Sequence, residues 1–114
     1  MKKFFRSLKC ALNGLKIVSL EERNFQIHIV LGAAAIILGL ALDVTRTEMM
    51  LLIVAVVFVL ASEAINTALE DLCNIVGPNP DPLIGKIKDI SAAFVLISVL
   101  GALALGAMIF LPYL

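Results

Sequence analysis

The chain has 114 residues, of which 61% are hydrophobic and 16% are charged. Because soluble domains are about 45–50% apolar, this composition indicates a membrane protein and excludes a disordered chain or a nucleic-acid-binding arm. Nine basic and nine acidic residues give a net charge of zero, so the positions of the charges are more informative than their sum.

The N-terminal segment, residues 1–20, has the pattern of a basic amphipathic helix. At 100° per residue, one face of that helix is apolar and comprises Phe4, Phe5, Leu8, Ala11, Leu12, Leu15 and Val18. The opposite face is polar and mostly basic: Lys2, Arg6, Lys9, Asn13 and Lys16. Such a helix can lie in the lipid headgroup plane with its cations near anionic lipid. We expect a membrane-surface helix here, with an ordinary soluble amphipathic helix as the alternative.

Three long apolar segments follow and predict three transmembrane helices, at about residues 25–42, 47–75 and 88–112. The third is the clearest, because residues 90–114 contain no charge. A loop is expected between the second and third helices, where four helix-breaking residues occur: Gly77, Pro78, Pro80 and Pro82. No linker divides the chain. The sequence therefore predicts an all-α membrane protein with a single domain spanning residues 1–114.

The distribution of lysine and arginine predicts the orientation of these helices. Six of the nine basic residues precede the first transmembrane helix: Lys2, Lys3, Arg6, Lys9, Lys16 and Arg23. Only Arg46 lies between the first and second helices, Lys86 and Lys88 lie between the second and third, and none follows the third. Since cytoplasmic loops are rich in basic residues, we expect the N-terminus and the second loop to be cytoplasmic and the C-terminus to face outward.

Polar residues on the second transmembrane helix are the strongest candidates for chemistry. Glu63, Asn66 and Glu70 share one face, stacked over two turns. Ionisable groups near lipid are costly and usually serve a function in a protein interior or a wet cavity. The alternative is a structural polar seam, or acids that simply reach the headgroup layer.

The predicted topology brings further charges to the same cytoplasmic end: Glu22 before the first helix, and Lys88 and Asp89 before the third. Two carboxylates with phosphate oxygens suit Mg²⁺, a lysine suits phosphate charge, and another carboxylate can accept a hydroxyl proton. The grouping therefore favours chemistry on a phosphate group that is bound with Mg²⁺. A small ion or proton transporter or channel subunit that uses the intramembrane carboxylates is the main alternative, and a non-enzymatic accessory subunit is a third possibility.

The chain resembles the small bacterial integral-membrane lipid kinases, the family that includes diacylglycerol kinase and undecaprenol kinase. The resemblance covers nearly the whole chain. It is carried by Ala11-xx-Gly14, by Glu22–His28 (ERNFQIH), by Glu63–Glu70 (EAINTALE), and by Pro82-Leu83 followed by Lys88–Leu96 (KDISAAFVL). It implies a kinase of the bacterial inner membrane, with its active site on the cytoplasmic side. Its expected substrates are ATP and a membrane lipid alcohol. No nucleic acid is expected as a partner.

The resemblance also implies roles for particular residues. Glu63 would be the catalytic base for the lipid hydroxyl, with Asn66 supporting the site and Ala92 beside the lipid substrate. Glu22 and Glu70 would hold Mg²⁺ with ATP. Glu22 is preferred to its neighbour Glu21 because it heads the matching Glu-Arg-Asn-Phe run.

Lys88 and Asp89 would contact the nucleotide, and the family resemblance implies a homotrimer with sites between subunits. The Glu-Arg-Asn-Phe-x-Ile-His run favours undecaprenol over diacylglycerol as the substrate. Three positions depart from the family pattern: Asn74, where an acid is common, and Ile87 and Phe94, where small residues are usual. These departures bear on lipid preference and rate more than on the reaction.

Overall fold

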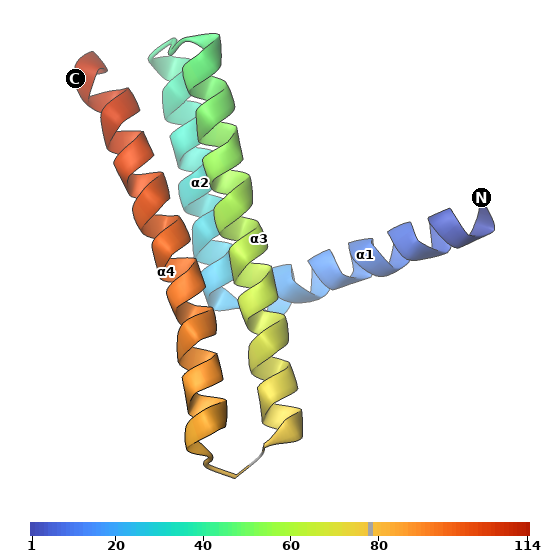
Figure 1. Ribbon diagram of the computed structural model, residues 1–114. Coiled ribbons are helices and arrows are strands. Elements are labelled where there is room, and N and C mark those ends of the chain that lie inside the picture. Colours follow the sequence, from blue (N-terminus) through green and yellow to red (C-terminus); the bar gives the residue numbers. More distant parts are fainter. Residues whose placement is uncertain (78) are drawn as a thin grey trace.

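The computed structural model describes residues 1–77 and 79–114, and these form an all-helical chain (Figure 1). The elements are α1 (Lys2–Glu21), α2 (Arg23–Ala41), α3 (Arg46–Val76), α4 (Pro82–Phe110) and a short 3-10 turn, η1 (Leu111–Tyr113). The helices α2, α3 and α4 are each long and apolar enough to cross a membrane. The predicted fold class, three membrane-spanning helices after an N-terminal helix, is therefore confirmed.

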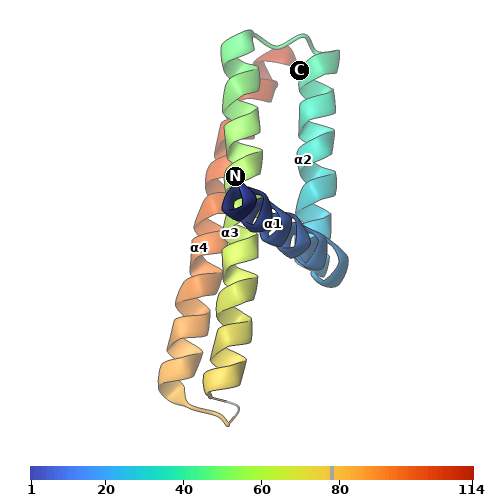
Figure 2. The same cartoon turned by 90° about the vertical axis from the view of Figure 1, so that its right-hand side faces the viewer.

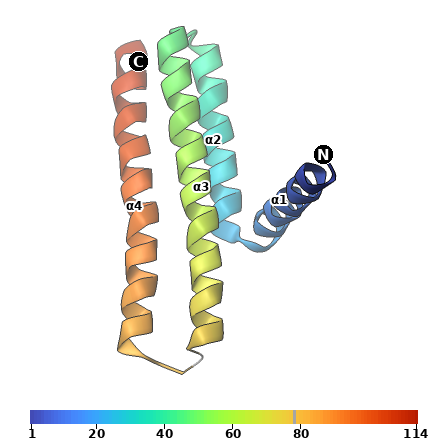
Figure 3. The ribbon, with the colours of Figure 1, turned by 45° about the vertical axis from the view of Figure 1, so that its right-hand side comes forward.

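The three long helices form a flat bundle with α3 in the middle. Helix α3 packs against both α2 and α4, and Figures 1 and 3 show α4 running beside α3 along its whole length. Helix α1 leaves the bundle at a steep angle and contacts mainly the start of α2 (Figure 2). Both α3 and α4 continue past the junction of α1 and α2 before they are joined (Figure 1).

The junction between α1 and α2 is a single residue, Glu22. Its extended backbone, with φ −102° and ψ 110°, ends one helix and caps the next. The Gln26 side-chain amide donates to the carbonyl oxygens of Ser19 at 3.0 Å and Leu20 at 3.3 Å, which satisfies backbone acceptors at the end of α1. The sharp turn between the helices is thus fixed by local hydrogen bonds.

Helix α4 begins at Pro82, six residues before the predicted start near residue 88. Asp81 is the N-cap, and its carboxylate accepts a hydrogen bond from the Leu83 amide at 2.8 Å. Proline suits the first turn of a helix, because the amide hydrogen that it lacks would have no helical partner there. Assigning Pro82 to the loop was therefore wrong. Pro78 lies outside the described residues.

Helix α2 packs closely against helix α3 at Gly32. A Cβ atom at this position would lie 2.6 Å from Cγ1 of Val56, so the missing side chain allows the contact. Few side chains are buried in this thin bundle, with Phe25, Leu52 and Val59 among them, while most large apolar side chains are exposed. Such a surface is typical of a protein that faces lipid or other copies of itself.

Candidate active site

Glu63 is the buried carboxylate at the centre of the site. Its side chain is 4% exposed, and its Oε2 atom has no hydrogen-bond partner among the described residues. Glu22 at the junction of α1 and α2, His28 of α2 and Glu70 of α3 lie close enough to interact with it, and the Asn24 amide approaches it as well. An unpartnered buried carboxylate oxygen is costly, so this atom is available to a substrate.

A hydrogen-bond network joins α3 to α4 next to Glu63. The side-chain Nδ2 of Asn66 donates to Oε1 of Glu70 at 3.2 Å, and the Ser91 hydroxyl donates to the side-chain Oδ1 of Asn66 at 2.7 Å. Asn66 and Glu70 were predicted to share a face, and they are joined. Ser91 was missed by the sequence reasoning, although it is a buried hydroxyl within an apolar helix, and such a group needs a partner.

The other predicted site residues of α4 lie within one turn of Ser91: Lys88, Asp89 and Ala92. The Lys88 ammonium group donates to Oδ1 of Asn74 on α3 at 2.5 Å, so the asparagine that departs from the family pattern holds the lysine. Asp89 and Ala92 are exposed in the described chain. The Phe94 ring lies beside that of Phe58, with 5.9 Å between their centroids.

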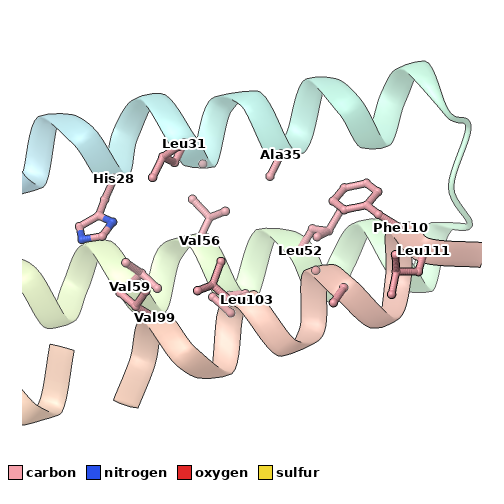
Figure 4. Close-up of a pocket in the computed structure, with 15 residues that line it drawn as sticks. His28, Leu31, Ala35, Leu52, Val56, Val59, Val99, Leu103, Phe110 and Leu111 are labelled. Atoms are coloured by element: carbon pink, nitrogen blue, oxygen red, sulfur yellow. The ribbon is translucent and has the colours of Figure 1, made fainter. Parts of the chain in front are cut away.

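An open apolar groove of about 390 Å³ lies between α2 and α4, with α3 as its floor (Figure 4). Val56 and Val59 of α3 form part of the floor, and Val99 and Phe110 of α4 lie along one wall. His28 lines the end of the groove nearest Glu63. Helix α2 and helix α4 are thus separated by a cleft rather than packed together.

The sequence of the chain is similar to those of known proteins. Residues 9–110 match the family model for prokaryotic diacylglycerol kinase. The chain belongs to this family. It is 29% identical to the undecaprenol kinase of Bacillus subtilis over 98% of its own length and 91% of that protein. It is 34% identical to the diacylglycerol kinase of Haemophilus influenzae over 81% of its own length and 78% of that protein.

A third relative, the diacylglycerol kinase of Escherichia coli K12, is 31% identical over 87% of the chain and 84% of its own length. Membership of the prokaryotic diacylglycerol kinase family makes the chain a lipid kinase, a phosphotransferase that uses ATP and acts on an alcohol. With three helices able to cross a membrane, it is an integral membrane protein. The family thus favours the kinase over the transporter alternative.

Glu22 and Glu70, the predicted magnesium ligands, could hold the ion only if phosphate oxygens of ATP supplied further ligands. Among residues 1–77 and 79–114, no group of three or more His, Cys, Asp or Glu side chains could hold a metal. Glu22 and Glu70 are half-buried, and only one oxygen of Glu70 accepts a hydrogen bond from Asn66. Since Mg²⁺ takes one or two carboxylates with phosphate oxygens and water, this pair is chemically suitable.

Proposed function

We propose that the chain transfers the γ-phosphate of ATP to the hydroxyl group of a membrane lipid alcohol, at the end of the bundle that carries Glu63. The observation that carries this proposal is the unpartnered Oε2 atom of a carboxylate that is only 4% exposed. Glu63 lies one helical turn beyond Val59, which lines the apolar groove, and one turn before Asn66, which belongs to the polar network that joins α3 and α4. A lipid hydroxyl can therefore reach a proton acceptor without leaving apolar surroundings.

In the proposed reaction, Glu63 is the general base. The lipid oxygen forms a bond to the γ-phosphorus of ATP, the bond from that phosphorus to the β–γ bridging oxygen breaks, and the hydroxyl proton passes to the Glu63 carboxylate. The products are a lipid phosphate and ADP. Phosphoryl transfer depends mainly on positioning and charge stabilisation, so a small set of residues is sufficient.

Asn66 positions the second carboxylate of the site. It donates to Glu70 and accepts from Ser91, so the amide is held from both sides and its own orientation is fixed. Glu70 and Glu22 would hold Mg²⁺ on the ATP phosphates, and the ion would neutralise charge that develops on the transferred group. Glu22 is the junction between α1 and α2, so the same residue would link the surface helix to the site.

Lys88 and Asp89, near the start of α4, would contact the nucleotide. Lys88 is half-buried and is held by Asn74, which points its ammonium group toward α3. Asp89 is exposed and free to bind a polar part of ATP. Ala92, also exposed, lies one turn from Lys88 and would border the lipid substrate.

We favour undecaprenol over diacylglycerol as the lipid alcohol. The Glu22–His28 run supports this choice, as does similarity to the Bacillus subtilis undecaprenol kinase over 98% of the chain. Diacylglycerol is the second candidate, supported by the 34% identity to the Haemophilus influenzae diacylglycerol kinase. Both lipids offer one primary hydroxyl on a long apolar body.

We further propose a homotrimer in the bacterial inner membrane, with the N-terminus and the active site cytoplasmic. The thin bundle and its many exposed apolar side chains support assembly. The excess of lysine and arginine before α2 supports the orientation. In this arrangement α1 would lie on the anionic inner surface, with the exposed Phe4, Phe5 and Leu8 in the lipid.

The test uses the full chain purified into mixed micelles with Mg²⁺-ATP and either undecaprenol or diacylglycerol. We expect a phosphorylated lipid, with faster turnover of undecaprenol. Glu63→Gln should abolish turnover while circular dichroism shows an intact helical fold. Asp71→Asn, which removes an exposed and unassigned carboxylate of the same helix, should retain activity. Full activity of Glu63→Gln would overturn the assignment of the base.

A further inference from the structure

His28 has a position in the groove that its isolation in the sequence does not suggest. It is half-buried, and Figure 4 shows its imidazole pointing from α2 toward α3. Among the described residues that line the groove, every side chain except His28 is hydrocarbon or absent, so His28 is the one polar group in that set. A single polar side chain at the end of an apolar cleft fixes the orientation of an amphipathic ligand.

The end of the groove that His28 lines is also the end nearest Glu63. His28 is close enough to Glu63 for the two side chains to interact. Val59, a floor residue of the groove, precedes Glu63 by one helical turn and therefore lies on the same face of α3. The apolar cleft and the buried carboxylate thus meet at His28.

The chemistry of the neighbours shows what His28 can add. Two carboxylates lie near Glu63, Glu22 at the junction of α1 and α2 and Glu70 of α3, and ionised carboxylates accept hydrogen bonds but cannot donate them. Asn24 can donate, but it does not line the groove. Neutral imidazole keeps one N–H donor, so His28 can donate from within the groove without a change in its charge.

We propose that His28 is a further catalytic residue, which donates a hydrogen bond to the oxygen of the lipid hydroxyl and holds its proton toward Oε2 of Glu63. One lone pair of that oxygen receives the imidazole N–H, and another attacks the γ-phosphorus. Glu63 then takes the proton as the new bond forms. This inference rests on the proposed role of Glu63 as the base.

The consequence is a defect specific to the lipid side of the reaction. His28→Ala should lower kcat/KM for the lipid by about tenfold or more, the cost of one lost hydrogen bond in a buried site. The KM for ATP should not change, because His28 lines the lipid groove. His28→Gln, which keeps an N–H donor, should restore part of the activity, whereas His28→Phe, which fills the space without a donor, should not.

The experiment measures steady-state kinetics in mixed micelles with undecaprenol or diacylglycerol varied at saturating Mg²⁺-ATP. The control is Val30→Ala, an exposed residue on the same helix that does not line the groove, and it should behave as the wild type. If His28→Ala does not fold, the difference between the glutamine and phenylalanine variants decides the question. Equal activity of those two folded variants would overturn the proposal.

The outcomes separate this inference from the proposed function. If the wild type phosphorylates lipid, Glu63→Gln is inactive and all His28 variants match the wild type, then the proposed function stands and the role of His28 is wrong. If the wild type phosphorylates neither lipid, the proposed function fails and this inference fails with it. A lipid-specific loss in His28→Ala, restored by glutamine, supports both.

Discussion

Ser91 of α4 and Asn66 of α3 are joined by a hydrogen bond of 2.7 Å between side chains 25 residues apart. The bond connects the first half of α4 to the face of α3 that carries Glu63, Asn66 and Glu70. Asn66 also donates to Glu70, so loss of the serine hydroxyl would leave the amide held from one side only.

We therefore expect Ser91→Ala to lower the turnover number several-fold and to reduce the unfolding free energy by about 1 kcal/mol. Lipid kinase assays and unfolding in a denaturing detergent measure the two effects. Ser98→Ala is the matched control, because Ser98 is also buried on α4 but donates to the Phe94 carbonyl of its own helix at 2.9 Å. Equal loss of turnover in both variants would contradict the prediction.

The contact between α2 and α3 gives a second prediction. Gly32→Ala places a methyl group 2.6 Å from Val56, a β-branched side chain with little freedom to move. We expect a loss of about 1–3 kcal/mol in unfolding free energy. Val56→Ala in the same chain should recover part of it, which detergent unfolding of the single and double variants would show.

Gly39→Ala provides the comparison for Gly32. The added methyl group would meet the end of the Met49 side chain at 2.9 Å, and methionine adjusts more easily. We expect a smaller loss of stability at this position than at Gly32. A larger loss at Gly39 would show that rigidity of the neighbouring side chain does not control the cost.

A third prediction concerns the end of the bundle opposite the site. Thr45 and Glu48 form a capping box at the start of α3, and the Tyr113 hydroxyl donates to the same glutamate. Thr45→Ala should cost about 1 kcal/mol of stability, measured by thermal unfolding, while kinase activity per folded protein is unchanged. Thr47→Ala, an exposed neighbour, should have little effect. A selective loss of turnover would contradict this separation of stability from catalysis.

A fourth prediction concerns the nucleotide. Lys88→Gln should raise the KM for ATP by about tenfold or more, because the variant lacks the positive charge proposed to contact the phosphates. The KM for lipid should change little. Lys86→Gln removes an exposed lysine of the same helix and should retain normal kinetics. If the two variants change the KM for ATP equally, general attraction by basic residues, not a specific contact of Lys88, explains the effect.

Periodicity and composition predicted the helices, because each apolar segment is long and its polar ends are clear. The start of α4 was placed too late because prolines were treated as loop residues, whereas Asp81 and Pro82 form a helix start. Helical spacing placed Asn66 and Glu70 together, but it could not show that Ser91 completes the network, since that contact depends on how α3 and α4 pack.

His28 illustrates the same limit. In the sequence it is a lone histidine and indicates only an interfacial residue. Its significance comes from the cleft between α2 and α4 and from the burial of Glu63, and both arise from packing among three helices. The family resemblance supplied expected roles for residues in the matched motifs, but it assigned none to this imidazole.

The hairpin formed by the lower parts of α3 and α4 extends beyond the level at which α1 meets α2 (Figure 1). Glu63 lies near Glu22, the junction of α1 and α2, whereas Lys88 bonds to Asn74 toward the joined ends of α3 and α4. The two substrates of a lipid kinase have opposite solubilities. If α1 lies on the membrane surface and the proposed residue roles hold, ATP would not have to enter hydrocarbon and the lipid would not have to leave it.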